Sequence, residues 1–289
     1  MTPPPEPPTA PDVTSLTTGK HGVLRMTFEP RGERTVVVDQ FWRIPLQVMP
    51  PSYQDEDGQA FLYLLNPTGG IVQGDRLDVE IRLRAGAQVL VTTQSATKVY
   101  RVERDCARET NRFVVEAGGL LEYLPDQTIP YAAAAFRRST HVDAHRTATV
   151  IVGEILSAGR VARGEAFEFT RVETELCITT DGVMRLLDRL DLRPATRPLP
   201  ALGVWEDHRH YASLHVVGPG VEDGLAGRVA ACLESREDVL GSASAPEEGL
   251  LVVRMLGHTM PELREVGFEV WDILRRGLVG KRARALRKL

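Results

Sequence analysis

Cysteine is scarce in this chain, and long apolar runs are missing. Cys106, Cys177 and Cys232 are its only cysteines, and they are odd in number and far apart in the sequence. Neither a disulfide framework nor a C-x-x-C metal pair is therefore expected, which suits a reducing cytoplasm. No run reaches the about 18 apolar residues that a membrane-spanning helix needs. The first residues also lack the basic and apolar regions of a signal peptide, so we expect a cytoplasmic protein that does not bind membranes.

An excess of charge of either sign is also missing. The 35 Lys and Arg residues nearly balance the 39 Asp and Glu residues, and the formal net charge is −4. General nucleic-acid binding requires a basic surface that displaces counterions, so no nucleic-acid partner is expected. Hydrophobic residues make up 43% of the chain, which is typical of a globular protein and excludes a collagen-like one.

Catalytic motifs are the third absence. The sequence contains no G-x-S-x-G elbow, no P-loop and no H-E-x-x-H helix. The glycine-rich segment 66–75 lacks the lysine and the following helix that phosphate binding requires, so it is interpreted as a turn that leads into a strand. We therefore expect no enzymatic activity. The alternative is an enzyme on a β-solenoid, for example one acting on a carbohydrate, with carboxylates from Glu173, Glu175 and Asp191.

A period of two dominates residues 35–178 and indicates β-strands. Apolar and charged residues alternate over 77–83, and segments 88–93 and 111–116 are further strands rich in Val and Thr. The apolar parity changes within 167–178, which predicts a β-bulge near Thr170 and Arg171. Asp181 and Gly182 tolerate positive φ and predict a tight hairpin turn.

A weak repeat joins these strands. The segment 85–87 (Ala-Gly-Ala) lies between two strands, and 117–119 (Ala-Gly-Gly) does the same 32 residues later. Short strands joined by similar glycine turns are typical of a stacked β-solenoid or a sandwich, so the residues alone leave both open.

The last third of the chain has helical periodicity. Residues 220–234 predict one helix, and 250–256 predict a buried strand. Thr259 and Glu262 form a capping box that opens a second helix, whose apolar face contains Leu263, Val266, Val270, Ile273, Leu274 and Leu278. Residues 235–248 are small and acidic and are interpreted as a surface connector.

These patterns divide the chain into three parts. Residues 1–12 contain six prolines and are expected to form an extended tail. Residues 13–280 are expected to form one mainly β domain with C-terminal helices. Residues 281–289 carry five basic residues and form a basic tail.

Two histidine pairs raise the alternative of a simple metal-binding protein. On a strand, His141, Asp143 and His145 would share one face, although a turn at 144–146 would remove it. His208 and His210 form a second H-x-H. Imidazole binds nickel, zinc and copper, and a carboxylate can complete such a site.

Two longer segments resemble the motifs of one protein family. Residues 65–76 resemble the N-P-[ST]-G-G-x-x-x-G-D motif of the urease accessory protein UreD (UreH) family through Asn66, Pro67, Gly69, Gly70, Gly74 and Asp75. Residues 90–101 resemble the family's L-T-T-x-x-A-[ST]-K-x-Y-R segment, at the expected distance, through Thr97, Lys98, Tyr100 and Arg101. Shorter matches extend the resemblance from about His21 to Gly280.

The resemblance implies a β-helix-like body, a few flanking helices and no enzymatic activity. It implies a scaffold that works with UreF and the GTPase UreG, docks on apo-urease and helps to deliver nickel to its active site. The nickel would pass through an internal tunnel with a polar and acidic lining, to which Asp75, Glu154, Thr97 and Lys98 correspond. Oxygen ligands hold Ni²⁺ transiently, so no tightly bound cofactor is expected. The alternatives are a turn-capping role for Asp75 and a buried ion pair for Glu154.

The chain departs from the family pattern after Leu124 and Pro125. Gln127 and Ala132 stand where the family has a glutamate and an aspartate. The departure predicts a tunnel with one acidic residue fewer, unless Asp126 takes its place.

Overall fold

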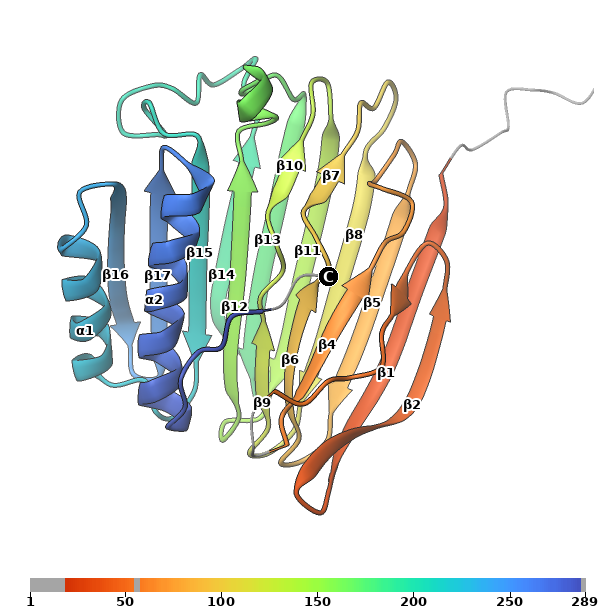
Figure 1. The fold of residues 1–289 in the computed structure, drawn as a ribbon, viewed down its shortest axis with the longest axis vertical. Coiled ribbons are helices and arrows are strands. Elements are labelled where there is room, and N and C mark those ends of the chain that lie inside the picture. Colours follow the sequence, from red (N-terminus) through yellow and green to blue (C-terminus); the bar gives the residue numbers. More distant parts are fainter. Residues whose placement is uncertain (1–18, 55–57, 287–289) are drawn as a thin grey trace, which may run out of the picture.

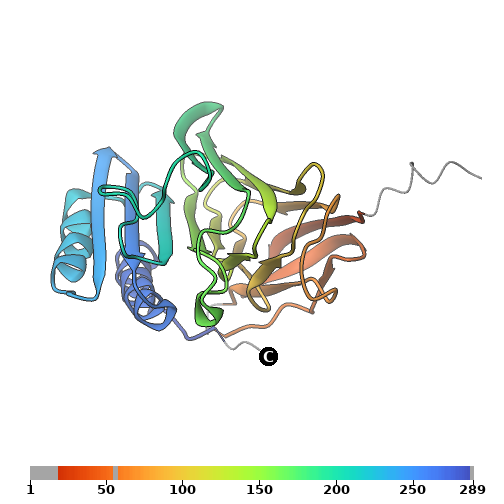
Figure 2. The same cartoon turned by 90° about the horizontal axis from the view of Figure 1, so that it is seen from above.

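The alternating pattern of the first two thirds of the chain produces two β-sheets that face each other (Figures 1 and 2). The structure is a computed structural model, and it describes residues 19–54 and 58–286. Within these residues, no helix is long and apolar enough to cross a membrane. The expected tail at 1–12 lies outside the described residues.

Sheet A and sheet B are named here by their strands. Sheet A consists, in spatial order, of β14 (Val183–Leu192), β13 (Arg171–Thr180), β11 (Ala135–Ala144), β8 (Ala107–Val115), β5 (Arg76–Leu83), β1 (His21–Arg31) and β2 (Arg34–Arg43). Sheet B consists of β16 (Val239–Glu247), β17 (Leu250–Gly257), β15 (His210–Val217), β12 (Thr149–Ser157), β9 (Leu120–Tyr123), β6 (Gln88–Thr93), β4 (Ala60–Leu65) and β3 (Gln47–Val48). Two short strands, β7 (Thr97–Val99) and β10 (Thr128–Pro130), pair with each other beside the main path of sheet B.

The chain passes back and forth between the sheets and builds a β-solenoid of about four turns. Strands β1, β5, β8, β11 and β13 stack in parallel in sheet A, and β4, β6, β9 and β12 do so in sheet B. The connecting turns stack as well. Gly86 and Gly118 both have positive φ, and the Gly86 amide donates to the Ala117 carbonyl (2.9 Å). The mainly β, solenoid-like fold is thus confirmed.

The inward faces of the two sheets form the main hydrophobic core. Alternate residues of β5 are buried, as the alternation over 77–83 predicted. Large side chains such as Phe28, Phe113 and Phe136 fill the space between the sheets and are at most 1% exposed. Burial of this apolar area is the main stabilising contribution to the solenoid.

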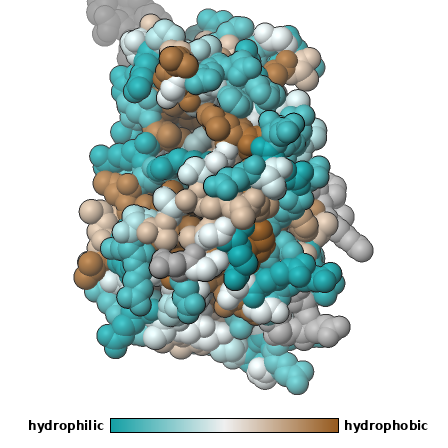
Figure 3. Space-filling view, turned by 90° about the vertical axis from the view of Figure 1, so that its left-hand side faces the viewer, coloured by the Kyte–Doolittle hydropathy of each residue, from teal (hydrophilic) through white to brown (hydrophobic). Residues whose placement is uncertain are grey.

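Two helices in the last third cover the outer face of sheet B. Helix α1 (Asp223–Glu234) packs on β16, and α2 (Met260–Val279) lies along β15 and β17 (Figure 1). The capping box of Thr259 and Glu262 is confirmed at the start of α2. A short 3₁₀ helix, η2 (Val161–Arg163), follows β12. Hydrophilic and hydrophobic residues are interspersed on the surface over α1 and β16 (Figure 3).

One prediction about local structure was wrong. The supposed connector at 235–248 contains strand β16, which gains its order from pairing with β17 because its own residues are mostly small and exposed. The bulge expected near Thr170 and Arg171 is supported, because the amides of both residues donate to the Ala134 carbonyl (2.8 and 3.1 Å) and the buried parity changes between Phe169 and Val172. Strand β13 begins at Arg171, and its ladder with β14 has a further register shift between Ile178 and Thr179. The hairpin turn at Asp181 and Gly182 is confirmed by positive φ at both residues.

The segment after α2 folds back over sheet B. Lys281 Nζ donates to Gln88 Oε1 (3.0 Å), and the Ala283 amide donates to Asp272 Oδ1 (2.7 Å). Arg275 is fully buried beneath this segment and donates to Gln59 Oε1 (2.7 Å). The described part of the basic segment, up to residue 286, therefore packs on the sheet.

Candidate functional site

The two family-like motifs lie side by side at one edge of the solenoid. The glycine loop, defined as residues 66–75, contacts β7 because the Ile71 amide donates to the Lys98 carbonyl (2.8 Å). The Tyr100 amide in turn donates to the Ile71 carbonyl (2.9 Å). Asn66 Oδ1 accepts from the Thr68 amide (3.2 Å) and opens the turn. Two segments about 30 residues apart in the sequence thus form one structural unit.

Gly70 makes this contact possible. A Cβ atom at this position would lie 2.4 Å from Tyr100 Cε2 and 2.8 Å from the Lys98 carbonyl oxygen. Its φ of 158° also lies where L residues rarely occur. The loop can therefore approach β7 this closely only with glycine at position 70.

Asp75, the last residue of the glycine loop, stabilises the loop through hydrogen bonds to its backbone and to the residue before β1. The carboxylate is 2% exposed, and it accepts from the Lys20 amide (2.8 Å) and from the Val72 amide (3.0 Å). Both carboxylate oxygens thus accept backbone hydrogen bonds. Asp75 is not among the residues that line the neighbouring cavity.

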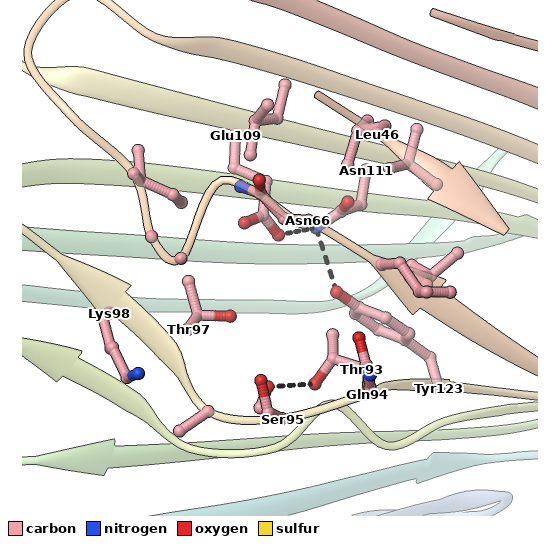
Figure 4. Close-up of a pocket in the computed structure, with 18 residues that line it drawn as sticks. Leu46, Asn66, Thr93, Gln94, Ser95, Thr97, Lys98, Glu109, Asn111 and Tyr123 are labelled. Atoms are coloured by element: carbon pink, nitrogen blue, oxygen red, sulfur yellow. Dashed lines mark hydrogen bonds between the residues drawn. The ribbon is translucent and has the colours of Figure 1, made fainter. Parts of the chain in front are cut away.

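A cavity of about 100 Å³ lies between the glycine loop and the solenoid interior (Figure 4). Thr97 and Lys98 line one side, and Glu109, Asn111 and Tyr123 line its inner end. Asn111 Nδ2 donates to Glu109 Oε1 (2.9 Å) and to Tyr123 Oη (3.2 Å), as the dashed lines in Figure 4 show. The cavity therefore ends on a network of polar groups.

Beyond this network, a polar column interrupts the apolar core. It consists of the stacked inward residues Glu109 of β8, Arg138 of β11 and Thr174 of β13, which are ladder partners. Arg138 is 5% exposed and holds Glu109 through Nε (2.9 Å) and Nη2 (3.3 Å). Its Nη1 donates to Thr128 Oγ1 (3.0 Å). Both carboxylate oxygens of Glu109 thus contact one buried guanidinium.

Glu154 of β12 completes the column from the opposite sheet. Its Oε2 accepts from Thr174 Oγ1 (2.9 Å), and its Oε1 lies 3.6 Å from Arg138 Nη1. Burial raises the pKa of Glu154, against the opposing effects of Arg138 and of the Thr174 hydrogen bond. The charge of Glu109 keeps the pKa of Arg138 raised although burial acts to lower it. Arg138 therefore stays cationic between two acids.

Arg138 also borders a small cavity inside the solenoid. A small cavity of about 20 Å³ between Tyr123, Arg138 and Glu154 has room for about one water molecule. A wider pocket of about 490 Å³ lies on the outer face of sheet A, where Glu173, Glu175 and Arg189 are among its lining residues. Tyr123 borders both the small cavity and the one beside the glycine loop. The polar groups thus follow one another from the loop into the interior.

The sequence reasoning did not single out Glu109 or Arg138. Each lies in register with buried neighbours, Arg138 between Phe136 and Thr140 and Glu109 between Ala107 and Asn111. The signal in the sequence was a charged residue at a strand position where the alternation predicts a buried side chain. The alternation of buried and exposed residues does not tell which strands are neighbours in the sheet. The pairing of Glu109 with Arg138 is therefore visible only in the structure.

The histidines of the two H-x-H pairs do not come together as expected. His141 Nε2 bonds Ser139 Oγ (2.7 Å) on the outside of β11, and His145 lies in the turn after it, bonded to Thr147 Oγ1 (2.8 Å). Asp143 accepts from Thr179 Oγ1 (2.6 Å). His210 is buried against Ser157 Oγ (3.1 Å), and burial lowers its pKa to about 4. His208 points elsewhere and stacks on His258, which the sequence reasoning missed.

The segment that departs from the family pattern lies beside α2. Asp126 pairs with Arg264 of α2 and accepts from the Gln127 amide (2.7 Å). The Ala132 amide donates to Glu165 Oε1 (2.9 Å). Asp126 lines an outer cavity under α2 and not the cavity beside the glycine loop.

The carboxylates considered for carbohydrate chemistry lie on β13 and β14 and pair with arginines. Glu173 contacts Arg137 (2.9 Å), and Glu175 contacts Arg189 (2.6 Å). Asp191 pairs with Arg193 (2.9 Å), whose hydrogen bond lowers the pKa of Asp191. Each acid is thus paired with an arginine, an arrangement that does not suit a general acid.

Comparison with known proteins extends the similarity over nearly the whole chain. The family model described as UreD urease accessory protein matches residues 20–288. Urease accessory protein UreD of Actinomyces naeslundii is 32% identical over 267 residues, which cover 92% of this chain and 98% of that protein. UreD 2 of Streptomyces griseus is 34% identical over 93% of this chain and 94% of its own length. UreD of Corynebacterium glutamicum is 33% identical over 92% and 97%. The chain belongs to the UreD family of urease accessory proteins, which are non-catalytic chaperones of urease maturation.

Proposed function

We propose that this chain acts in the cytoplasm with UreF and the GTPase UreG, docks on apo-urease with them, and carries nickel through its polar interior. The observation that supports the passage is the polar column of Glu109, Arg138 and Glu154 inside an otherwise apolar solenoid. Buried charges are costly to desolvate, so a fold that needed only stability gains little from them.

The chemistry of the lining suits transient contact with a divalent cation. Carboxylate and hydroxyl oxygens from Glu109, Thr128, Glu154 and Thr174 lie around Arg138. Oxygen ligands bind Ni²⁺ less tightly than imidazole or thiolate. Weak contact allows the ion to move on. Nickel is the cargo here, and no tightly bound cofactor is proposed.

Arg138 sets a condition on this passage. Its guanidinium occupies the place between the two acids that a cation would take. A nickel ion and the guanidinium repel each other at this range, so passage requires Arg138 to exchange its carboxylate partners for Ni²⁺ and to move aside.

The remaining candidate residues act at the mouth of the passage. Thr97 and Lys98 line the cavity beside the glycine loop, with the Lys98 side chain exposed. The backbone hydrogen bonds of Asp75 support a role in shaping the glycine loop. We therefore place nickel contact at Glu109 and Glu154 and assign to Asp75 the geometry of the mouth.

The test separates passage from assembly. Urease would be coexpressed with its accessory proteins, with this chain as wild type or as Glu154→Gln, and with Glu80→Gln as a matched control. Glu80 is on the outer face of β5, and its side chain is 51% exposed. The complex would be quantified by co-purification, and urease nickel by metal analysis.

Glu154→Gln is expected to assemble normally and to lower urease nickel, while Glu80→Gln leaves both unchanged. Full nickel with normal assembly in Glu154→Gln would contradict the passage. Failure of assembly in this variant would instead assign Glu154 a purely structural role.

A further inference from the structure

Three metal-binding side chains meet outside the solenoid interior, at the end of sheet B where β15 begins and β17 ends. Asp207 and His208 lie just before β15, separated from it by Arg209, and His258 lies between β17 and α2. Strands β15 and β17 are antiparallel neighbours, with His210 opposite Gly257. The fold therefore brings two segments about 50 residues apart to the upper end of these strands in Figure 1.

The backbone around this cluster is held firmly. The Arg209 amide donates to the Gly257 carbonyl (3.0 Å), which ties the two segments together. Arg209 Nη1 donates to the carbonyls of Asp207 (2.7 Å) and His208 (2.9 Å). A site built on such a frame loses little conformational entropy when it binds a ligand.

One ligand atom from each of the three side chains lies within 4.8 Å of the other two. Asp207 is central, with Oδ1 at 3.7 Å from His208 Nδ1 and Oδ2 at 3.9 Å from His258 Nδ1. The two imidazole rings are stacked, with centroids 4.5 Å apart and planes inclined by 16°. One carboxylate thus lies close to two neighbouring imidazoles.

The hydrogen bond between His208 and a backbone carbonyl is of the kind that metal-binding histidines make. Its Nδ1 lies 2.9 Å from the Trp205 carbonyl oxygen, and because a carbonyl only accepts, Nδ1 carries the proton. The neutral ring then has its lone pair on Nε2, which makes no hydrogen bond within the described part of the chain. A backbone carbonyl that fixes the tautomer in this way is typical of metal-ligating histidines.

The exposed side chains of Asp207 and His258 can move closer to His208, as metal binding requires. Metal–ligand bonds of about 2.0–2.2 Å place two tetrahedral ligand atoms about 3.3 Å apart, so the cluster must contract by at most about 1.5 Å. The side chain of His208 is only 10% exposed, whereas those of Asp207 and His258 are 77% and 47% exposed. His258 can therefore leave the stack by rotation and direct its lone pair to an ion held by His208.

We propose that Asp207, His208 and His258 form a surface site for one divalent transition-metal ion of the borderline class, such as Ni²⁺ or Zn²⁺. Two imidazoles and one carboxylate are a donor set for these ions and not for Mg²⁺ or Ca²⁺, which take oxygen ligands. Water completes the coordination on the exposed side. The site lies outside the passage and does not depend on it.

The test is equilibrium binding of Ni²⁺ alone, and separately Zn²⁺ alone, to the full chain at about pH 7.5, where imidazole is mostly neutral. His258→Gln and Asp207→Asn remove ligands at exposed positions, so folding is expected to be retained. His145→Gln is the matched control, because His145 is partly exposed but lies in a turn, where it bonds to Thr147. Thermal melting by circular dichroism confirms that each variant folds.

We expect His258→Gln to weaken one binding event at least about tenfold, the size of loss that a disturbed ligand set produces. Asp207→Asn is expected to weaken the same event, and His145→Gln to leave it unchanged. Equal affinities in the wild type and in both ligand variants would overturn the proposal. An equal loss in His145→Gln, or no binding by the wild type, would overturn it as well.

Discussion

Replacing Arg138 by methionine should be among the most damaging changes in the solenoid. The side chain is 6% exposed and makes the bidentate contact with Glu109 and the contact with Glu154. Methionine keeps much of the apolar stem but leaves two buried carboxylates without their cation. Removal of one partner of a buried ion pair typically costs about 3–5 kcal/mol, so we expect a loss of this size in the free energy of unfolding.

A second variant isolates the cause of this loss. Glutamine at Glu154 still accepts the Thr174 hydrogen bond, and the raised pKa of Glu154 shows that its ionised form is disfavoured by burial. Glu154→Gln should therefore cost less than about 1 kcal/mol. Adding Glu109→Gln and Glu154→Gln to Arg138→Met should recover most of the stability, since neutral groups need no buried cation.

Urea unfolding of the wild type and the three variants provides the measurement, with the slope checked for a constant change in exposed surface. The expected order is wild type near Glu154→Gln, then the triple variant, then Arg138→Met. If Arg138→Met changed stability by no more than about 0.5 kcal/mol, as surface substitutions do, the column would not be a buried charge network.

Three other outcomes follow from the same structure. Gly70→Ala should destabilise the chain by about 1–3 kcal/mol more than Gly69→Ala in thermal melting. Of these two positions, only at position 70 would the added Cβ contact other atoms, and equal losses would contradict this reasoning. Trp271→Phe should cost about 1–3 kcal/mol in urea unfolding because it removes the 2.6 Å hydrogen bond to buried Glu122, and an unchanged midpoint would show that α2 docks without it. Burial acts to raise the pKa of Asp188, but its hydrogen bonds and charged partners lower it to about 2, below the ordinary 3.8. Its contribution to stability is thus complete above about pH 4 and is lost as the pH falls toward 2, so the difference between wild type and Asp188→Asn should shrink over this range.

Local patterns in the sequence predicted much of the fold. Alternation over 77–83 and the paired glycine turns at Gly86 and Gly118 correspond to stacked turns of the solenoid, and the capping box at Thr259 begins α2. Strand β16 was missed because its residues carry no alternation of their own and are ordered by pairing with β17. Long-range pairing of this kind leaves little trace in a short window of sequence.

The candidate site was only partly predictable for the same reason. The resemblance to the family indicated Glu154 but not its partner Arg138. In the sequence Arg138 looks like any other strand residue, and its role is visible only once β11 is paired with β8. The cluster at His208 also depended on pairing, since His258 joins it across β15 and β17. Sequence indicated which residues are polar and buried, and tertiary pairing determined which of them meet.

The central proposal is that nickel travels through this chain to urease inside the accessory complex. The most direct measurement is transfer of radioactive nickel from the metal-loaded UreG-type GTPase to apo-urease in the purified complex, with a chelator in the medium. Nickel shielded by the passage should reach urease despite the chelator with the wild-type chain, and much less should arrive with Glu154→Gln. Transfer that the chelator abolishes in the wild-type complex, or that Glu154→Gln leaves unchanged, would contradict the passage.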